Sequence, residues 1–145
     1  MTRTARLLVI AAVGDAVILL AFAAIGRSNH GASDGGPIFG TLGTAAPFLI
    51  GWFLAALVAV SRHTDPLGRM GRALALTGAT WLAGGIVGLI IHSLIEKHAA
   101  PLPFVIVALL FNLVWLALWH AVLVLVGGRS LYSPTPRSRA QSRSH

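Results

Sequence analysis

The sequence predicts an all-α membrane protein, a four-transmembrane-helix bundle with both termini in the cytoplasm and a disordered basic tail at its C-terminal end. Three observations indicate this fold class. Apolar residues make up 56% of the 145 residues, and the mean hydropathy is +0.81. Only 10% of the residues are charged, against about 25% in ordinary soluble domains. The apolar residues are also gathered into four runs that are separated by polar segments.

Each of the four runs approaches or exceeds the length that crosses a membrane. The runs cover residues 7–26, 44–61, 73–95 and 104–127. A helix needs about 17–25 residues to span roughly 30 Å of hydrocarbon. Helices are the expected form because a lipid-exposed segment has to satisfy its backbone hydrogen bonds internally. We therefore predict a transmembrane domain over residues 1–127.

The polar segments between the runs predict the connections. Residues 27–43 are rich in Gly, Ser and Asn, which is typical of a loop. Residues 61–72 and 96–103 contain prolines and predict two further connections, the second of which leads into a helix. Residues 128–145 are rich in Ser, Arg and Pro, and we predict that they form a disordered cytoplasmic tail.

The basic residues predict the orientation. Nine of the eleven Lys and Arg residues fall on one side of a four-helix threading, and only Arg27 and Lys97 fall on the other. The nine are Arg3, Arg6, Arg62, Arg69, Arg72, Arg129, Arg137, Arg139 and Arg143. Because basic segments stay in the cytoplasm, we expect a multi-pass protein of the inner (cytoplasmic) membrane. Topology thus explains the net charge of +7, and we expect no nucleic-acid partner.

A cleaved signal peptide is the alternative interpretation of the first run. The run has a basic start, an apolar stretch and the possible cleavage motif Ala21-Phe22-Ala23. Cleavage would leave three helices and an external N-terminus. The run is longer than the usual apolar region of about 7–15 residues, and it holds an acid at its centre. We therefore favour a retained helix.

Asp15 is the most informative polar residue, because ionisable groups inside a membrane are rare and are functional candidates by default. Its position predicts a depth of about 12 Å at 1.5 Å per residue. One hypothesis is a carboxylate that carries a proton or binds a cation. The other is a structural hydrogen bond between helices. His120 is expected at nearly the same depth in the fourth run and is the best candidate partner.

Two further polar residues are predicted to face other helices. His92 continues a stripe formed by Gly84 and Gly88, and such small-xxx-small spacing favours helix contact within the bundle or at a dimer seam. Asn112 lies in the outer half of the fourth run, where we expect an interhelical hydrogen bond worth about 1 kcal/mol or less.

The candidate functional polar residues are Asp15, Arg27, His30, His92 and His120. No catalytic, metal or cofactor site is predicted from them. The set His30, His92, Glu96 and His98 matches no zinc spacing, and the chain has no cysteine. His92 and His120 are expected at different depths, which disfavours a haem held between them within one subunit. Familiar hydrolase and phosphate-binding motifs are absent from the sequence.

The segment from Asp15 through Ala-Ile-Gly-Arg-Ser-Asn to His30, followed by Thr-Ala-Ala-Pro-Phe-Leu-Ile-Gly at 44–51, resembles the DUF3054 family of small bacterial and archaeal membrane proteins. The Phe-Val-Ile-Val-Ala start of the fourth run, from residue 104, is similar too. The resemblance covers about residues 7–127. It implies a four-helix membrane protein and no stated activity. It singles out Asp15, Gly26, Arg27, His30, Pro47, Phe48 and Gly51.

Two functions remain open on the sequence. The first is a structural or accessory partner in the lipid bilayer, either a homo-oligomer or a subunit of a membrane complex. This hypothesis is favoured by the helix faces that contain Gly and Ala and by the lack of a recognisable set of catalytic residues. The alternative is a small proton- or cation-coupled transporter that uses Asp15 and His120, with Arg27, His30 and His92 at the outer mouth. A lipid-modifying enzyme ranks below both, since the chain offers no nucleophile or metal set.

Overall fold

The computed structural model consists of four long helices, and it describes residues 3–29, 36–63 and 66–131. These are α1 (Arg3–Asn29), α2 (Gly36–Arg62), α3 (Met70–Glu96) and α4 (Leu102–Leu131). Each helix is long and apolar enough to cross a membrane. The all-α architecture with four candidate membrane spans is therefore confirmed.

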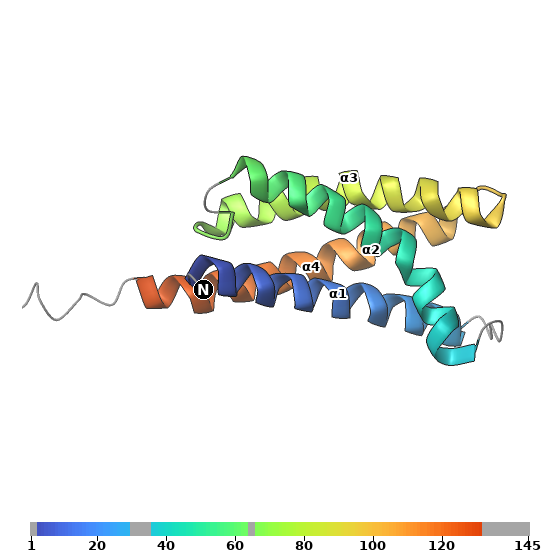
Figure 1. Cartoon of the computed structure of the whole chain (residues 1–145), viewed down its shortest axis with the longest axis horizontal. Coiled ribbons are helices and arrows are strands. Elements are labelled where there is room, and N and C mark those ends of the chain that lie inside the picture. The colour runs from blue at the N-terminus through green and yellow to red at the C-terminus, as the bar shows by residue number, and fades with distance from the viewer. Residues whose placement is uncertain (1–2, 30–35, 64–65, 132–145) are drawn as a thin grey trace, which may run out of the picture.

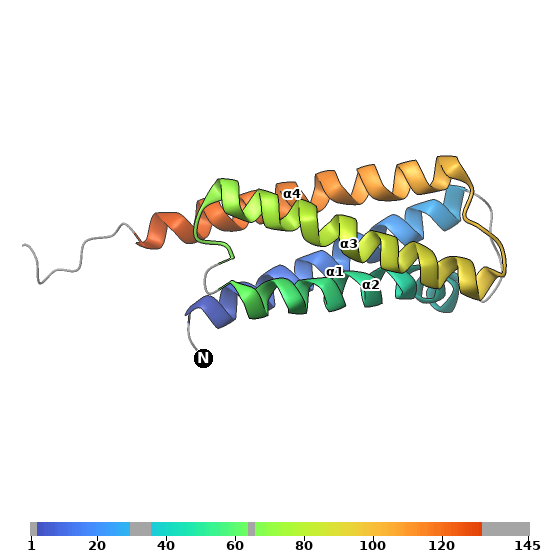
Figure 2. The ribbon, with the colours of Figure 1, turned by 90° about the horizontal axis from the view of Figure 1, so that it is seen from above.

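The helices form an antiparallel bundle in which each helix lies beside two others (Figures 1 and 2). α1 and α3 both contact α2 and α4, and within the described residues the backbones of the diagonal pairs do not approach each other closely. We call the end at which α1 begins and α2 passes into α3 the proximal end. The end at which α3 passes into α4 is the distal end.

Two predicted boundaries are wrong. α2 begins at Gly36, so residues 36–43 are helical rather than part of a loop. Gly36 has φ 67°, which glycine adopts without strain, and the following proline suits a first helical turn. α4 continues to Leu131, so residues 128–131 are helical and not disordered. The predicted tail beyond them, residues 132–145, lies outside the described residues.

α2 and α3 approach each other at glycines. A Cβ on Gly51 would lie 2.1 Å from the carbonyl oxygen of Gly84, and a Cβ on Gly88 would lie 3.0 Å from Cα of Phe48. Such close backbone packing is the role of small residues between membrane helices, and it confirms that the Gly84/Gly88 stripe faces another helix. Pro47 lies inside α2, which bends in its first half (Figure 1), because proline removes a helical hydrogen bond there.

Aromatic rings fill the distal half of the bundle. Phe22 of α1, Phe48 of α2, His92 of α3, and Phe104 and Phe111 of α4 form what we call the distal aromatic cluster. His92 stacks on Phe104 with 5.3 Å between ring centroids. Neighbouring ring pairs lie 5.6 to 6.4 Å apart. The rings from four helices therefore close this half with apolar contacts.

Two indoles separate the distal half from the proximal half. Trp52 and Trp81 are 1% and 0% exposed, and their ring centroids lie 6.0 Å apart. Trp81 donates its N–H to the carbonyl oxygen of Leu109 at 2.9 Å, so α3 and α4 are tied together at the level of the indoles. On the outside the bundle exposes large apolar side chains along all four helices, as expected of surfaces that face lipid.

Candidate functional site

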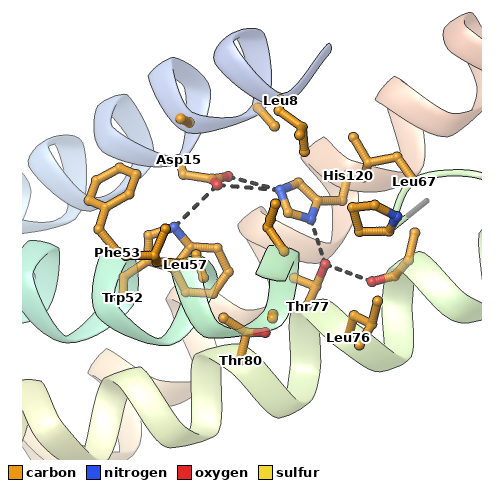
Figure 3. A pocket seen from close by; sticks show the side chains of 17 residues that line it. Leu8, Asp15, Trp52, Phe53, Leu57, Leu67, Leu76, Thr77, Thr80 and His120 are labelled. Atoms are coloured by element: carbon orange, nitrogen blue, oxygen red, sulfur yellow. Dashed lines mark hydrogen bonds and ion pairs between the residues drawn. The ribbon is translucent and has the colours of Figure 1, made fainter. Parts of the chain in front are cut away.

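Four polar side chains, one from each helix, meet in the proximal half (Figure 3). His120 Nε2 on α4 lies 3.1 Å from Oδ1 and 3.4 Å from Oδ2 of Asp15 on α1. The indole N–H of Trp52 on α2 donates to Asp15 Oδ2 at 3.2 Å. The Thr77 hydroxyl on α3 lies 2.5 Å from His120 Nδ1. The pairing of Asp15 with His120, which their depths predict, is confirmed.

A glycine beside the acid allows α4 to reach it. A Cβ on Gly14 would lie 2.2 Å from the Trp119 ring, so this indole rests directly on the α1 backbone. The Trp119 N–H also donates to the carbonyl oxygen of Ala11 at 3.2 Å. Because Trp119 is fixed against α1 in this way, the next residue, His120, is held beside Asp15.

The hydrogen bonds of Thr77 assign a proton to His120. Thr77 Oγ1 donates to the carbonyl oxygen of Ala73 at 2.8 Å. A hydroxyl has one proton to donate, so toward His120 Nδ1 the Thr77 oxygen accepts. With the Thr77 proton assigned to the carbonyl of Ala73, Nδ1 carries a proton, and Nε2 is the ring nitrogen that faces the carboxylate.

Asp15 and His120 share one further proton. A bare Nε2 lone pair against a carboxylate would be repulsive, so a proton lies between the two groups, either on His120 or on Asp15. In both arrangements the pair carries no net charge. Asp15 is 4% exposed and the His120 side chain 12%, and a neutral pair avoids the cost of an isolated buried charge.

A cavity of about 430 Å³ borders this network. Its described lining comes from all four helices and from Pro66 and Leu67 in the α2–α3 connection, and it is apolar except at five residues. These are Asp15, Trp52, Thr77, Thr80 and His120. Small-molecule sites are typically about 300–1,000 Å³ and combine apolar walls with a few convergent polar groups. The cavity thus has the character of a ligand site.

The other candidate residues lie elsewhere. His92 belongs to the distal aromatic cluster, so it points into the bundle as predicted. Arg27 is in the last turn of α1 at the distal end, and His30 lies outside the described residues. Among the candidates that the structure describes, only Asp15 and His120 come together. Within the same residues no three His, Asp or Glu side chains gather as metal ligands.

Asn112 does not make the interhelical hydrogen bond expected of it. Its Nδ2 donates to the carbonyl oxygen of Ala108 at 2.8 Å, within α4. The side chain is 0% exposed, and Oδ1 finds no hydrogen-bond partner among the described residues. The expectation was wrong because an amide can bond to its own helix one turn back, which needs no neighbouring helix.

Three contributors to the site were not found from the sequence as parts of it: Gly14, Trp52 and Thr77. Trp52 carried a usable signal. Tryptophan in membrane helices concentrates at the two interfaces, whereas Trp52 lies well inside α2. A buried indole N–H needs an acceptor, and an intramembrane carboxylate is the strongest acceptor in the chain. Gly14 and Thr77 carried no comparable signal, since small residues are frequent in all four helices.

Four apolar helices around a buried carboxylate–imidazole pair define a small multi-pass membrane protein. The model of the family described as "Protein of unknown function (DUF3054)" matches residues 12–123, and the chain belongs to this family. The matched range contains Asp15, Trp52, Thr77 and His120. No curated protein and no solved structure matches the chain.

Proposed function

We propose that this protein is a small proton-coupled transporter, in which Asp15 and His120 form the proton site and the adjoining cavity takes the transported molecule. The observation that carries the proposal is that the pair borders a cavity of about 430 Å³. A pair that serves only to lock α1 to α4 would be expected to be packed on all sides, as the core of the distal half is. Here both groups line the space where a ligand would lie.

The proton and the ligand are linked by this geometry. Any molecule that occupies the cavity next to Asp15 or His120 changes the environment of the shared proton. A ligand that binds better to one protonation state must shift the proton equilibrium by the same free energy. Transport further requires a second state in which the distal aromatic cluster parts. Its members are held mainly by ring contacts.

Vesicles that contain the full chain and a pH-sensitive dye in the lumen test the proposal. Three probes without titratable groups are added outside: ethidium, Nile red and 8-anilinonaphthalene-1-sulfonate, which are cationic, neutral and anionic. We expect at least one to change the lumenal pH with wild-type protein and not with Asp15→Asn. Glu96→Gln is the matched control, because it neutralises an exposed acid outside the cavity. Equal signals from wild type and Asp15→Asn with every probe would contradict the proposal.

The charge distribution supports an orientation of the protein in the membrane and a location in the cell. We propose that the proximal end faces the cytoplasm of a cell with an inner membrane, with both termini on that side. Arg6, Arg62, Arg69 and Arg72 are exposed near this end, in agreement with the positive-inside rule. The chain has no cysteine, so Arg62→Cys and Lys97→Cys each carry a single thiol. In intact cells an impermeant maleimide should label only the second.

A structural or accessory role is the second candidate, and an exposed face of α3 favours it. Gly71, Ala75, Ala79 and Ala83 follow one another at intervals of four residues and are all exposed on the bundle. Lines of small residues allow membrane helices to pack closely. We expect a homodimer by native mass spectrometry that Ala79→Leu weakens. Ala24→Leu, at an exposed alanine of α1, is the control, and a wild-type monomer would contradict this role.

A further inference from the structure

We propose that the ligand of the cavity is a lipophilic monocation, such as an organic amine or quaternary ammonium ion, which replaces the proton shared by Asp15 and His120. This inference rests on the proposed function and adds the chemical class of the ligand. Three observations carry it: the charge of the site, the rings around it, and the surface at which the cavity opens.

The charge of the site selects a cation. Asp15 and His120 are the only titratable groups among the described residues that line the cavity, and with one shared proton they are neutral together. Loss of that proton alone would leave a carboxylate in apolar surroundings, which is costly. If a monocation enters as the proton leaves, the site stays neutral. An anion or a second proton would create a net charge instead.

The exchange balances without any covalent change. The cation forms an ion pair with the Asp15 carboxylate, and one proton leaves from the Asp15–His120 pair to water. His120 remains neutral, and its remaining proton moves to Nε2, which donates to the carboxylate. The Thr77 hydroxyl then turns from the carbonyl oxygen of Ala73 and donates to Nδ1. Trp52 continues to donate to Asp15 Oδ2. One positive charge has entered and one has left, so the cation and the proton compete for the carboxylate.

Aromatic rings border the part of the cavity in which the cation would lie. The Trp52 ring centroid is 6.3 Å from that of His120, so a cation beside Asp15 and His120 would lie near this indole. Phe53 also lines the cavity. Cations are attracted to such rings within about 6 Å of the centroid. Apart from Thr77 and Thr80, the remaining walls are aliphatic and suit the hydrocarbon part of the ligand.

The cavity reaches the lipid-facing surface of α2, which favours a lipophilic ligand. Phe53, Leu57 and Val60 line it and are 36%, 69% and 38% exposed. At the proximal end, by contrast, arginines are exposed, and their charge opposes the approach of a hydrophilic cation from water on that side. A ligand dissolved in the bilayer enters past α2 without meeting them.

Binding of tetraphenylphosphonium to the full chain in lipid nanodiscs tests the inference, with empty nanodiscs as the background. Tetraphenylborate is the matched probe, since it has nearly the same shape and the opposite charge. We expect saturable binding of the phosphonium and none of the borate. One proton released per cation would raise the apparent Kd about tenfold for each unit by which the pH falls. Calorimetry in two buffers of different ionisation enthalpy should count about one proton.

The variants isolate Asp15. Asp15→Asn should weaken phosphonium binding at least tenfold and abolish its pH dependence, whereas Asp15→Glu should retain both and Glu96→Gln should leave both unchanged. If Asp15→Asn does not fold, the pH dependence of the wild type decides alone. A pH-independent affinity, or borate binding as tight as phosphonium binding, overturns the inference.

Failure of this inference is distinguishable from failure of the proposed function. If the phosphonium does not bind, while Nile red or the anionic probe changes the lumenal pH in an Asp15-dependent manner, the ligand class is wrong and proton coupling stands. If no probe gives an Asp15-dependent lumenal signal, proton coupling itself is wrong.

Discussion

The proximal and distal halves of this bundle are built from the same four helices by opposite means. In the distal half, rings from all four helices contact one another, and Gly88 allows α2 and α3 to touch. In the proximal half, one polar side chain from each helix surrounds a cavity. The difference indicates that packed rings stabilise the distal half, while the proximal half keeps an open space beside its polar groups. Three pairs of variants and one single variant test that division.

The largest expected effect comes from two phenylalanines on α2. Phe48 is 2% exposed within the distal aromatic cluster, whereas Phe53 is 36% exposed and lines the cavity. Phe48→Ala should open a void in packed surroundings and destabilise the fold by on the order of 3 kcal/mol. Phe53→Ala should cost much less, because it enlarges a space that is already there. Thermal unfolding in mild detergent measures both, and equal losses would refute the division.

The next effect concerns glycines of the same helix. Gly51→Ala would put a methyl group 2.1 Å from the Gly84 carbonyl oxygen, so α2 and α3 have to separate, at a cost of about 1–3 kcal/mol. Gly43→Ala meets nothing within 4 Å and should be neutral or slightly stabilising, since alanine favours a helix more than glycine does. The same unfolding assay compares the two. A stable Gly51→Ala protein would show that this contact is not tight.

These packing details mark the limit of what the sequence predicts. The four helices follow from the lengths of the apolar runs, and the Asp15–His120 pair follows from counting residues to equal depth. Depth is encoded by position along a helix. The rotation of a helix about its own axis is not encoded in this way. Helices that are apolar on every side have little sequence pattern to show which face is buried. For this reason Trp52 and Thr77, which lie at suitable depths, were not placed at the site.

The start of α2 shows a second limit. Glycines and Thr41 in the segment before residue 44 are typical of a loop, yet Ile38, Phe39 and Leu42 lie on the exposed surface of a helix. In water such exposure would be unfavourable, but in lipid it is not. The loop signal therefore has less weight next to a membrane span than it has in a soluble protein.

A smaller effect is expected within the polar network. Thr77→Val keeps the shape of the side chain but removes the acceptor of the His120 Nδ1 proton, and a buried donor without a partner costs about 1–3 kcal/mol. The tautomer of His120 should also change, which ¹⁵N NMR of the ring detects. Thr80→Val removes a hydroxyl from the same cavity and should leave the His120 ring signals unaltered. If both variants give the same His120 spectrum, Thr77 does not set the tautomer.

The smallest effect is expected at Asn112, whose Oδ1 is buried and finds no partner among the described residues. Asn112→Leu replaces this oxygen with a hydrocarbon of similar size. Because polar contacts between membrane helices average about 0.6 kcal/mol, the unfolding temperature should stay nearly constant or rise. A clear fall in that temperature would show that Asn112 holds a partner in the membrane.

The distance along the chain between Asp15 and His120 has a consequence for how the protein is made. The two residues are 105 positions apart, and a ribosome adds about 5–20 residues per second. For several seconds α1 therefore carries its acid into the membrane before the imidazole exists, at an insertion cost of about 2.5–3.5 kcal/mol. The most apolar stretch of α1 has a mean hydropathy of 2.6, the highest of the four helices, which offsets that cost. A chain that stops before residue 120 lacks the partner of Asp15, and this unmatched acid distinguishes an incomplete product from a finished one.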